Sequence, residues 1–129
     1  MENNLILIDT SVLIDYFRKT DKANSYFINL VDRQFNFSIS LITYYEIYVG
    51  ATASQYDFWQ KCLGNISVIS LDEKIADVAV SINHFLKQKK CQIPIADLFI
   101  AATAIANNLP ISTLNIKHFE RIDNLKIVE

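Results

Sequence analysis

The most constraining feature of the sequence is a short apolar run that ends in an acid. Residues 5–8 are Leu-Ile-Leu-Ile, and Asp9 follows them at once. Such a run predicts a strand buried on both faces, the form that a central strand takes in a parallel sheet. A carboxylate at the mouth of this strand is costly if it stays dry and unpaired, so Asp9 must be solvated, cap a helix or bind a cation.

Further along the chain, strand patterns alternate with helical patterns. Strands are predicted at 35–42, 66–69, 110–114 and 125–128, in addition to 5–8. Helical spacing of apolar residues predicts helices at 12–17, 22–31, 43–49, 56–63, 73–90 and 94–106. This alternation predicts an α/β fold, a three-layer α/β/α sandwich with a mostly parallel five-strand sheet. We expect a single domain over residues 1–129.

Composition and charge limit the class of protein. The chain has 129 residues, of which 51% are hydrophobic, with two Gly and two Pro, and this favours one compact core. We expect a cytoplasmic protein with no membrane association, because the sequence has no signal-peptide pattern and no apolar run of about 18 residues. Cys62 and Cys91 lack metal-site spacing and are expected to be reduced thiols.

The charge distribution gives no sign of a broad nucleic-acid surface. The formal net charge is −2, so any contact with nucleic acid must be local. Basic residues gather at Arg18 and Lys19, at 87–90 and at 117–121. We interpret these clusters as solvated helix ends, where cations complement the helix dipole.

Polar side chains fall where the predicted strands end and the next helices begin. Four of them come from distant parts of the chain: Asp9, Glu46, Asp97 and Asn115. In a parallel α/β sheet these points share one edge, and ligands bind there. Short hydroxyl side chains are expected at the same edge, namely Thr10, Ser11, Thr43 and Thr113.

Each acid at this edge has a structural explanation when it is taken alone. Asp9 is a candidate N-cap, Glu46 matches a capping box with Thr43, and Asp97 suits the first turn of a helix. Three converging carboxylates, however, would repel one another and raise the pKa of at least one. A hard divalent cation such as Mg²⁺ or Mn²⁺ removes that conflict, because it takes oxygen ligands. Zinc is disfavoured, since the edge offers neither Cys nor a His pair.

Four segments resemble the successive motifs of PIN-domain ribonucleases, and most of all those of VapC-type toxins. They are IDTSVLID at 8–15, SLITYYE at 40–46, IPIADLFIAA at 93–102 and STLNIKHF at 112–119. The resemblance implies a Mg²⁺- or Mn²⁺-dependent endoribonuclease that hydrolyses RNA phosphodiesters. It implies that Asp9, Glu46 and Asp97 bind metal, with Thr10 or Thr113 in support.

The chain departs from the family pattern where many relatives carry a further acid. Asn115 and, three residues on, His118 stand at these positions. We expect Asn115 to coordinate through its carbonyl oxygen or hold a metal-bound water, but without adding charge. For His118, proton transfer or RNA contact and packing beside Phe119 both stay open.

The resemblance also implies partners. A VapC-type toxin pairs with a small antitoxin in a type II toxin–antitoxin pair, and we expect a homodimer. Some members of an aromatic group are predicted to form an exposed groove or dimer surface, with core packing as the alternative; the group is Tyr44, Tyr45, Tyr48, Tyr56, Phe58 and Trp59. The alternative function is a PIN-fold protein with weak or no nuclease activity, acting mainly as a protein-binding module.

Overall fold

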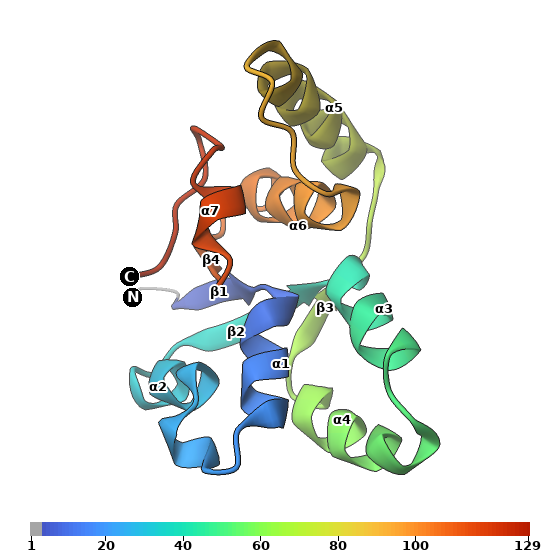
Figure 1. The fold of residues 1–129 in the computed structure, drawn as a ribbon, viewed down its shortest axis with the longest axis vertical. Coiled ribbons are helices and arrows are strands. Elements are labelled where there is room, and N and C mark those ends of the chain that lie inside the picture. The colour runs from blue at the N-terminus through green and yellow to red at the C-terminus, as the bar shows by residue number, and fades with distance from the viewer. Residues whose placement is uncertain (1–3) are drawn as a thin grey trace.

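A parallel sheet forms the centre of the protein (Figure 1). The structure is a computed structural model that describes residues 4–129. Its strands are β1 (Leu5–Ile8), β2 (Asn36–Ser40), β3 (Ser67–Ile69) and β4 (Ile111–Ser112). They lie in the order β3-β2-β1-β4, and every neighbouring pair is parallel. The first apolar run of the chain is therefore a central strand, as its sequence predicts.

Helices cover both faces of this sheet (Figure 1). The helices α1 (Thr10–Arg18), α2 (Tyr26–Asp32), α3 (Leu41–Val49) and α4 (Tyr56–Leu63) lie on one side. The helices α5 (Glu73–Gln88), α6 (Ile95–Ala106) and α7 (Ile116–Phe119) lie on the other. Short 3₁₀ turns, η1 and η2, occupy Lys22–Asn24 and Ala53–Gln55. The predicted three-layer α/β/α architecture is confirmed.

Strand β1 divides the hydrophobic interior because its side chains alternate between the two faces. Ile6 and Ile8 pack into the core shared with α1–α4, whereas Leu7 packs into the core shared with α5 and α6. All three side chains are almost completely buried. Asp9 thus directly follows three buried residues of a central strand.

The predicted fifth strand is reduced to one bridge. Residues 125–128 pair with β4 only through a parallel bridge between Ile111 and Ile127 within the described part of the chain. Ile111 donates its N–H to the carbonyl of Lys126 at 2.8 Å and accepts from the N–H of Val128 at 2.8 Å. Strand β4 is two residues long, so it offers few positions for pairing on either side.

Local capping decides where several helices begin and end. The predicted helix at 22–31 is divided, since the Ser25 hydroxyl accepts from the N–H of Ile28 and starts α2 afresh. Asp72 caps α5 through the N–H of Ile75 at 2.9 Å, and Gly50 ends α3, both as predicted. Within residues 4–129, no helix combines the length and apolar character that a membrane crossing requires.

The thiols and aromatic residues are divided between surface and core. Both cysteines are free and half-buried, and burial raises the pKa of the Cys62 thiol to about 11.

Trp59 is buried, whereas Tyr44, Tyr45 and Tyr56 are exposed. The ring of Tyr48 lies 4.8 Å from that of Tyr44 and 5.6 Å from that of Tyr56. Core packing is therefore found for Trp59, and Tyr48 packs partly against the same core, while Tyr44, Tyr45 and Tyr56 are exposed and the dimer surface stays a prediction.

Candidate functional site

Three of the four predicted site residues lie at the ends of elements, and Glu46 lies within a helix. Asp9 joins the end of β1 to the start of α1, and Asp97 lies in the first turn of α6. Asn115 directly precedes α7, and Glu46 lies in the middle of α3. Hydrogen bonds among these residues and the short hydroxyls, described below, connect segments that are more than one hundred residues apart in the chain.

Asp9 is a buried carboxylate held by two hydroxyl groups. It is 3% exposed. Ser11 donates a hydrogen bond to its Oδ2 at 2.8 Å, and Thr113 donates to the same oxygen at 2.7 Å. Asp9 occupies the N-cap position of α1, but its side chain does not cap that helix. Its carboxylate is therefore turned toward β4 and the residues that follow it.

The electrostatic surroundings of Asp9 disfavour its charge. Burial is the main cause that raises the pKa of the Asp9 carboxyl, and the charge of Asp97 raises it further. The hydrogen bonds from Thr113 and Ser11 act in the opposite direction, because they stabilise the ionised form. The influence of Asp97 brings the two acids into one electrostatic site, although 88 positions of sequence separate them.

Asp97 is held by Asn115 and His118. Its Oδ2 lies 2.6 Å from Nδ1 of His118 and 3.1 Å from Nδ2 of Asn115. Nδ2 of Asn115 also lies 2.8 Å from Nδ1 of His118, but one ring nitrogen cannot accept there and donate to the carboxylate at once. The shorter contact, to a charged acceptor, is the stronger, so Nδ1–H of His118 donates to Asp97.

The Asn115 backbone connects the Asp9 and Asp97 environments. Its N–H donates to the Thr113 hydroxyl at 2.8 Å, and that hydroxyl in turn donates to Asp9. The Ser11 hydroxyl, which also holds Asp9, accepts from the N–H of Leu114 at 3.0 Å. The loop after β4 is therefore fixed against the end of β1.

Glu46 is held by a second group of hydroxyls, in place of the predicted capping box. The hydroxyl of Thr10 lies 2.7 Å from Oε1 of Glu46 and 3.0 Å from the hydroxyl of Thr43. Helix α3 begins at Leu41, and Ser40 caps it through the N–H of Ile42. The capping-box prediction is wrong because the helix starts two residues earlier, which leaves the Thr43 and Glu46 side chains to face α1.

The site has hard oxygen donors, and the basic side chain that the described chain places against its carboxylates is His118 on Asp97. Within residues 4–129, no Lys or Arg forms an ion pair with Asp9, Glu46 or Asp97. In the same range, no side-chain hydrogen bond reaches Oδ1 of Asp9 or of Asp97. No three His, Cys, Asp or Glu side chains of the described chain converge closely enough to hold one ion together. Mg²⁺ needs only one or two carboxylates besides waters and phosphate oxygens, so the Asp9–Asp97 pair fits it.

The contact between His118 and Asp97 is the part of the site that sequence reasoning did not place. The signal was present in the spacing, because Asn115 and His118 are three residues apart and face the same direction across one helical turn. That spacing did not reveal their partner, because Asp97 belongs to another element, the first turn of α6. His118 also lies one position before Phe119, which is fully buried and anchors α7.

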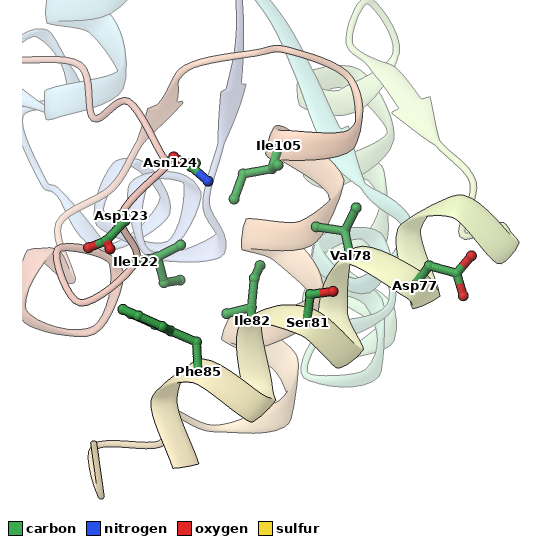
Figure 2. Close-up of a pocket in the computed structure, with 9 residues that line it drawn as sticks. All are labelled: Asp77, Val78, Ser81, Ile82, Phe85, Ile105, Ile122, Asp123 and Asn124. Atoms are coloured by element: carbon green, nitrogen blue, oxygen red, sulfur yellow. The ribbon is translucent and has the colours of Figure 1, made fainter. Parts of the chain in front are cut away.

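A separate pocket lies away from these carboxylates (Figure 2). It has a volume of about 500 Å³ between α5, α6 and the loop after α7. Its walls are mainly apolar, with Val78, Ile82 and Phe85 from α5 and Ile105 from α6. Two acids line its rim from different elements, but none of the predicted site residues does. The acidic edge is therefore the candidate active site.

Comparisons with known proteins find similarity over almost the whole chain. A family model described as the PIN domain matches residues 6–125. Ribonuclease VapC1 of Methanocaldococcus jannaschii is 35% identical over 122 residues, which are 94% of this chain and 83% of the relative. A toxin–antitoxin complex from Klebsiella pneumoniae contains a chain with a TM-score of 0.72 and 28% identity, covering 96% of each chain. VapBC2 from Rickettsia felis, bound to a promoter DNA fragment, gives a TM-score of 0.82 at 24% identity, covering 96% of this chain and 97% of that one.

Proposed function

The chain belongs to the PIN-domain family and, within it, to the VapC ribonucleases, and from this we propose that it is a divalent-metal-dependent endoribonuclease, the toxin of a type II toxin–antitoxin pair. The observation that carries the proposal is the pairing of Asp9 and Asp97 in one site, where no Lys or Arg of the described chain forms an ion pair with either carboxylate. Two neighbouring carboxylates repel each other, and their oxygens would suit a hard divalent cation.

The roles of the individual residues follow from their contacts. Asp9 and Asp97 would hold the cation, and Glu46 would support its binding from α3. Ser11 and Thr113 fix Oδ2 of Asp9, which sets the orientation of its carboxylate. In the same way, Asn115 and His118 fix Oδ2 of Asp97. Thr10 fixes Glu46 and is itself hydrogen-bonded to Thr43.

The chemistry that the cation supplies when bound is a water of lowered pKa and compensation of the charge that develops on the phosphate. The protein's own contribution is to hold its carboxylates rigidly at the end of β1 and the start of α6, so that the RNA phosphate meets preorganised groups. Mg²⁺ or Mn²⁺ is the proposed ion, because every direct donor is an oxygen. Asn115 adds no charge, so a second ion binds more weakly than the first.

We propose two protein partners besides the RNA substrate. One is a small antitoxin, on the precedent of the Klebsiella toxin–antitoxin complex, which contains a similar chain. The other is a second copy of this chain, joined through the exposed tyrosines of α3 and α4. We propose that the protein acts in the cytoplasm, where cellular RNA would be its substrate.

The proposed function is tested by RNA cleavage with the wild type and Asp97→Asn. Asp123→Asn serves as a matched control, since it removes one carboxylate from the pocket of Figure 2. We expect wild type and Asp123→Asn to cut cellular RNA when Mg²⁺ or Mn²⁺ is present. Asp97→Asn should lose at least about a hundredfold in rate, while its circular dichroism stays native. Wild type that binds the metal but cuts no RNA would favour the protein-binding alternative.

Expression in a host cell tests the toxin assignment. The chain produced without the neighbouring gene should stop growth, and co-expression of that gene should restore it. Asp97→Asn should be harmless in both cases. Harmless overproduction of intact, metal-competent wild type would count against a toxin.

A further inference from the structure

The exposed face of α1 carries two basic residues that the active site does not explain. Arg18 and Lys19 stand at the end of this helix, and both are exposed. Arg18 makes no hydrogen bond or ion pair with another residue of the described chain. Lys22, by contrast, caps α1 by donating to the carbonyls of Tyr16 and Phe17. Carbonyl groups at the end of α1 therefore have a hydrogen-bond donor in Lys22, and Arg18 is not needed to cap the helix.

A groove joins these basic residues to the active site. It has a volume of about 570 Å³ and runs along α1 from Thr10 and Ser11, past Ile14 and Asp15, to Arg18 and Lys19. Its inner end is made of the two hydroxyls that hold Glu46 and Asp9. A ligand that fills the groove therefore contacts the active site at one end and the two cations at the other.

A second groove beside the first reaches the other side of the site. It has a volume of about 440 Å³, shares Asp15 and Lys19 with the first groove and extends to Leu114. Leu114 is bound to Ser11 through its N–H at 3.0 Å. The wall between the grooves is acidic only at Asp15, which accepts from the N–H of Tyr26 at 3.0 Å and faces Lys19 at 3.9 Å. Asp15 is therefore occupied within the protein.

The length and charge of this surface fit an RNA backbone. From Thr10 to Arg18 the helix rises about 12 Å, which spans about three or four stacked nucleotides. Two adjacent cations at the far end provide the local phosphate contact that a chain with a net charge of −2 requires. We propose that single-stranded RNA lies along the exposed face of α1, with phosphates on Arg18 and Lys19 and the scissile phosphate at Thr10 and Ser11.

This inference rests on the proposed ribonuclease function and assigns the path of its substrate. Its test is the binding of a random-sequence single-stranded RNA pool in EDTA, where hydrolysis is off, followed by KM and kcat in Mn²⁺. The variant is Arg18→Gln/Lys19→Gln. The control of equal charge is Lys87→Gln/Lys90→Gln, at the end of α5 far from α1 (Figure 1).

We expect Arg18→Gln/Lys19→Gln to weaken binding by about tenfold at low salt and to reduce the salt slope by about 1.4, since each single-strand contact contributes about 0.7. KM should rise with little change in kcat. The charge-preserving exchange Arg18→Lys/Lys19→Arg should restore binding, and Lys87→Gln/Lys90→Gln should bind as wild type.

Equal binding by wild type and Arg18→Gln/Lys19→Gln would overturn the proposed path, and so would an equal loss in the α5 control. Failure of the proposed function would appear differently, as the absence of metal-dependent cleavage by wild type. An exposed double substitution should leave the fold intact, and circular dichroism of each variant checks this.

Discussion

At the scale of single residues, the site is organised around two carboxylates whose second oxygen is already fixed. Ser11 and Thr113 hold Asp9, and Asn115 and His118 hold Asp97. The sequence indicates Asp9 and Asp97 because strand ends and helix starts share one edge of a parallel sheet. It does not indicate His118, whose contact with Asp97 depends on how α6 and α7 meet.

The first residue-scale prediction concerns the charge of Asp9. Because burial raises its pKa above the ordinary value of 3.8, ionised Asp9 destabilises the metal-free fold. The contribution of Asp9 to the free energy of unfolding is favourable at acidic pH, where the carboxyl is protonated. This contribution is lost as the pH rises through the folded-state pKa. Asp9→Asn should therefore increase the free energy of unfolding in EDTA at neutral pH.

Urea denaturation in EDTA across acidic to neutral pH measures this effect. The advantage of Asp9→Asn over wild type should shrink as the pH falls, and Mn²⁺ should stabilise wild type alone. A variant less stable than wild type at neutral pH would show that the buried charge is compensated in the metal-free protein.

The second residue-scale prediction concerns Asn115. Asn115→Asp adds a negative charge beside Asp97, which Asn115 contacts. Calorimetric titration should show Mn²⁺ affinity increased by about tenfold, or about 1.4 kcal/mol. Asn115→Ser, which adds no charge, is the control. Unchanged affinity in Asn115→Asp would place this side chain outside the reach of the ion.

At the scale of elements, local signals predict helix ends only where a cap acts within its own helix. Asp72 and Gly50 do so, and their predicted roles are confirmed. Thr43 and Glu46 match a capping box in sequence. In the structure, however, Ser40 caps α3, and the Thr10 hydroxyl donates a hydrogen bond to Glu46. That outcome depends on the packing of α1 against α3, which local spacing does not contain.

The prediction at this scale separates stability from activity. Asp72→Ala removes the hydrogen bond to the N–H of Ile75 and should lower the free energy of unfolding by about 1 kcal/mol. Since α5 contributes none of the proposed site residues, kcat and KM for RNA should stay within error of wild type. Urea denaturation and cleavage assays on the same preparations test this. A large fall in kcat would connect α5 to the site.

At the scale of the whole molecule, the order of strands and helices in the sequence predicts most of the architecture. The alternation of strands and helices predicts the layers and the parallel sheet correctly, because apolar period and length are local properties. The predicted fifth strand is found only as one bridge to β4, which is itself two residues long. We propose that residues 1–129 form one domain, since β1 contributes to both cores.

The prediction for the molecule as a whole concerns self-association. Tyr44 is 42% exposed and lies against Tyr48, so Tyr44→Lys places a charge in the proposed dimer surface. We expect Tyr44→Lys to sediment as a monomer at concentrations where wild type is a dimer. Val80→Lys, on α5 and 54% exposed, should sediment as wild type. Dimeric Tyr44→Lys would exclude this surface as the interface.

The central claim is that the Asp9 carboxylate acts on RNA through a divalent cation. The most direct measurement is the rate of RNA cleavage as a function of Mn²⁺ concentration, for wild type and Asp9→Asn purified in parallel. We predict a saturable rate for wild type that EDTA abolishes and added Mn²⁺ restores, with no cleavage by Asp9→Asn at any concentration. Cleavage that persists in EDTA, or equal rates in the two proteins, would contradict the claim.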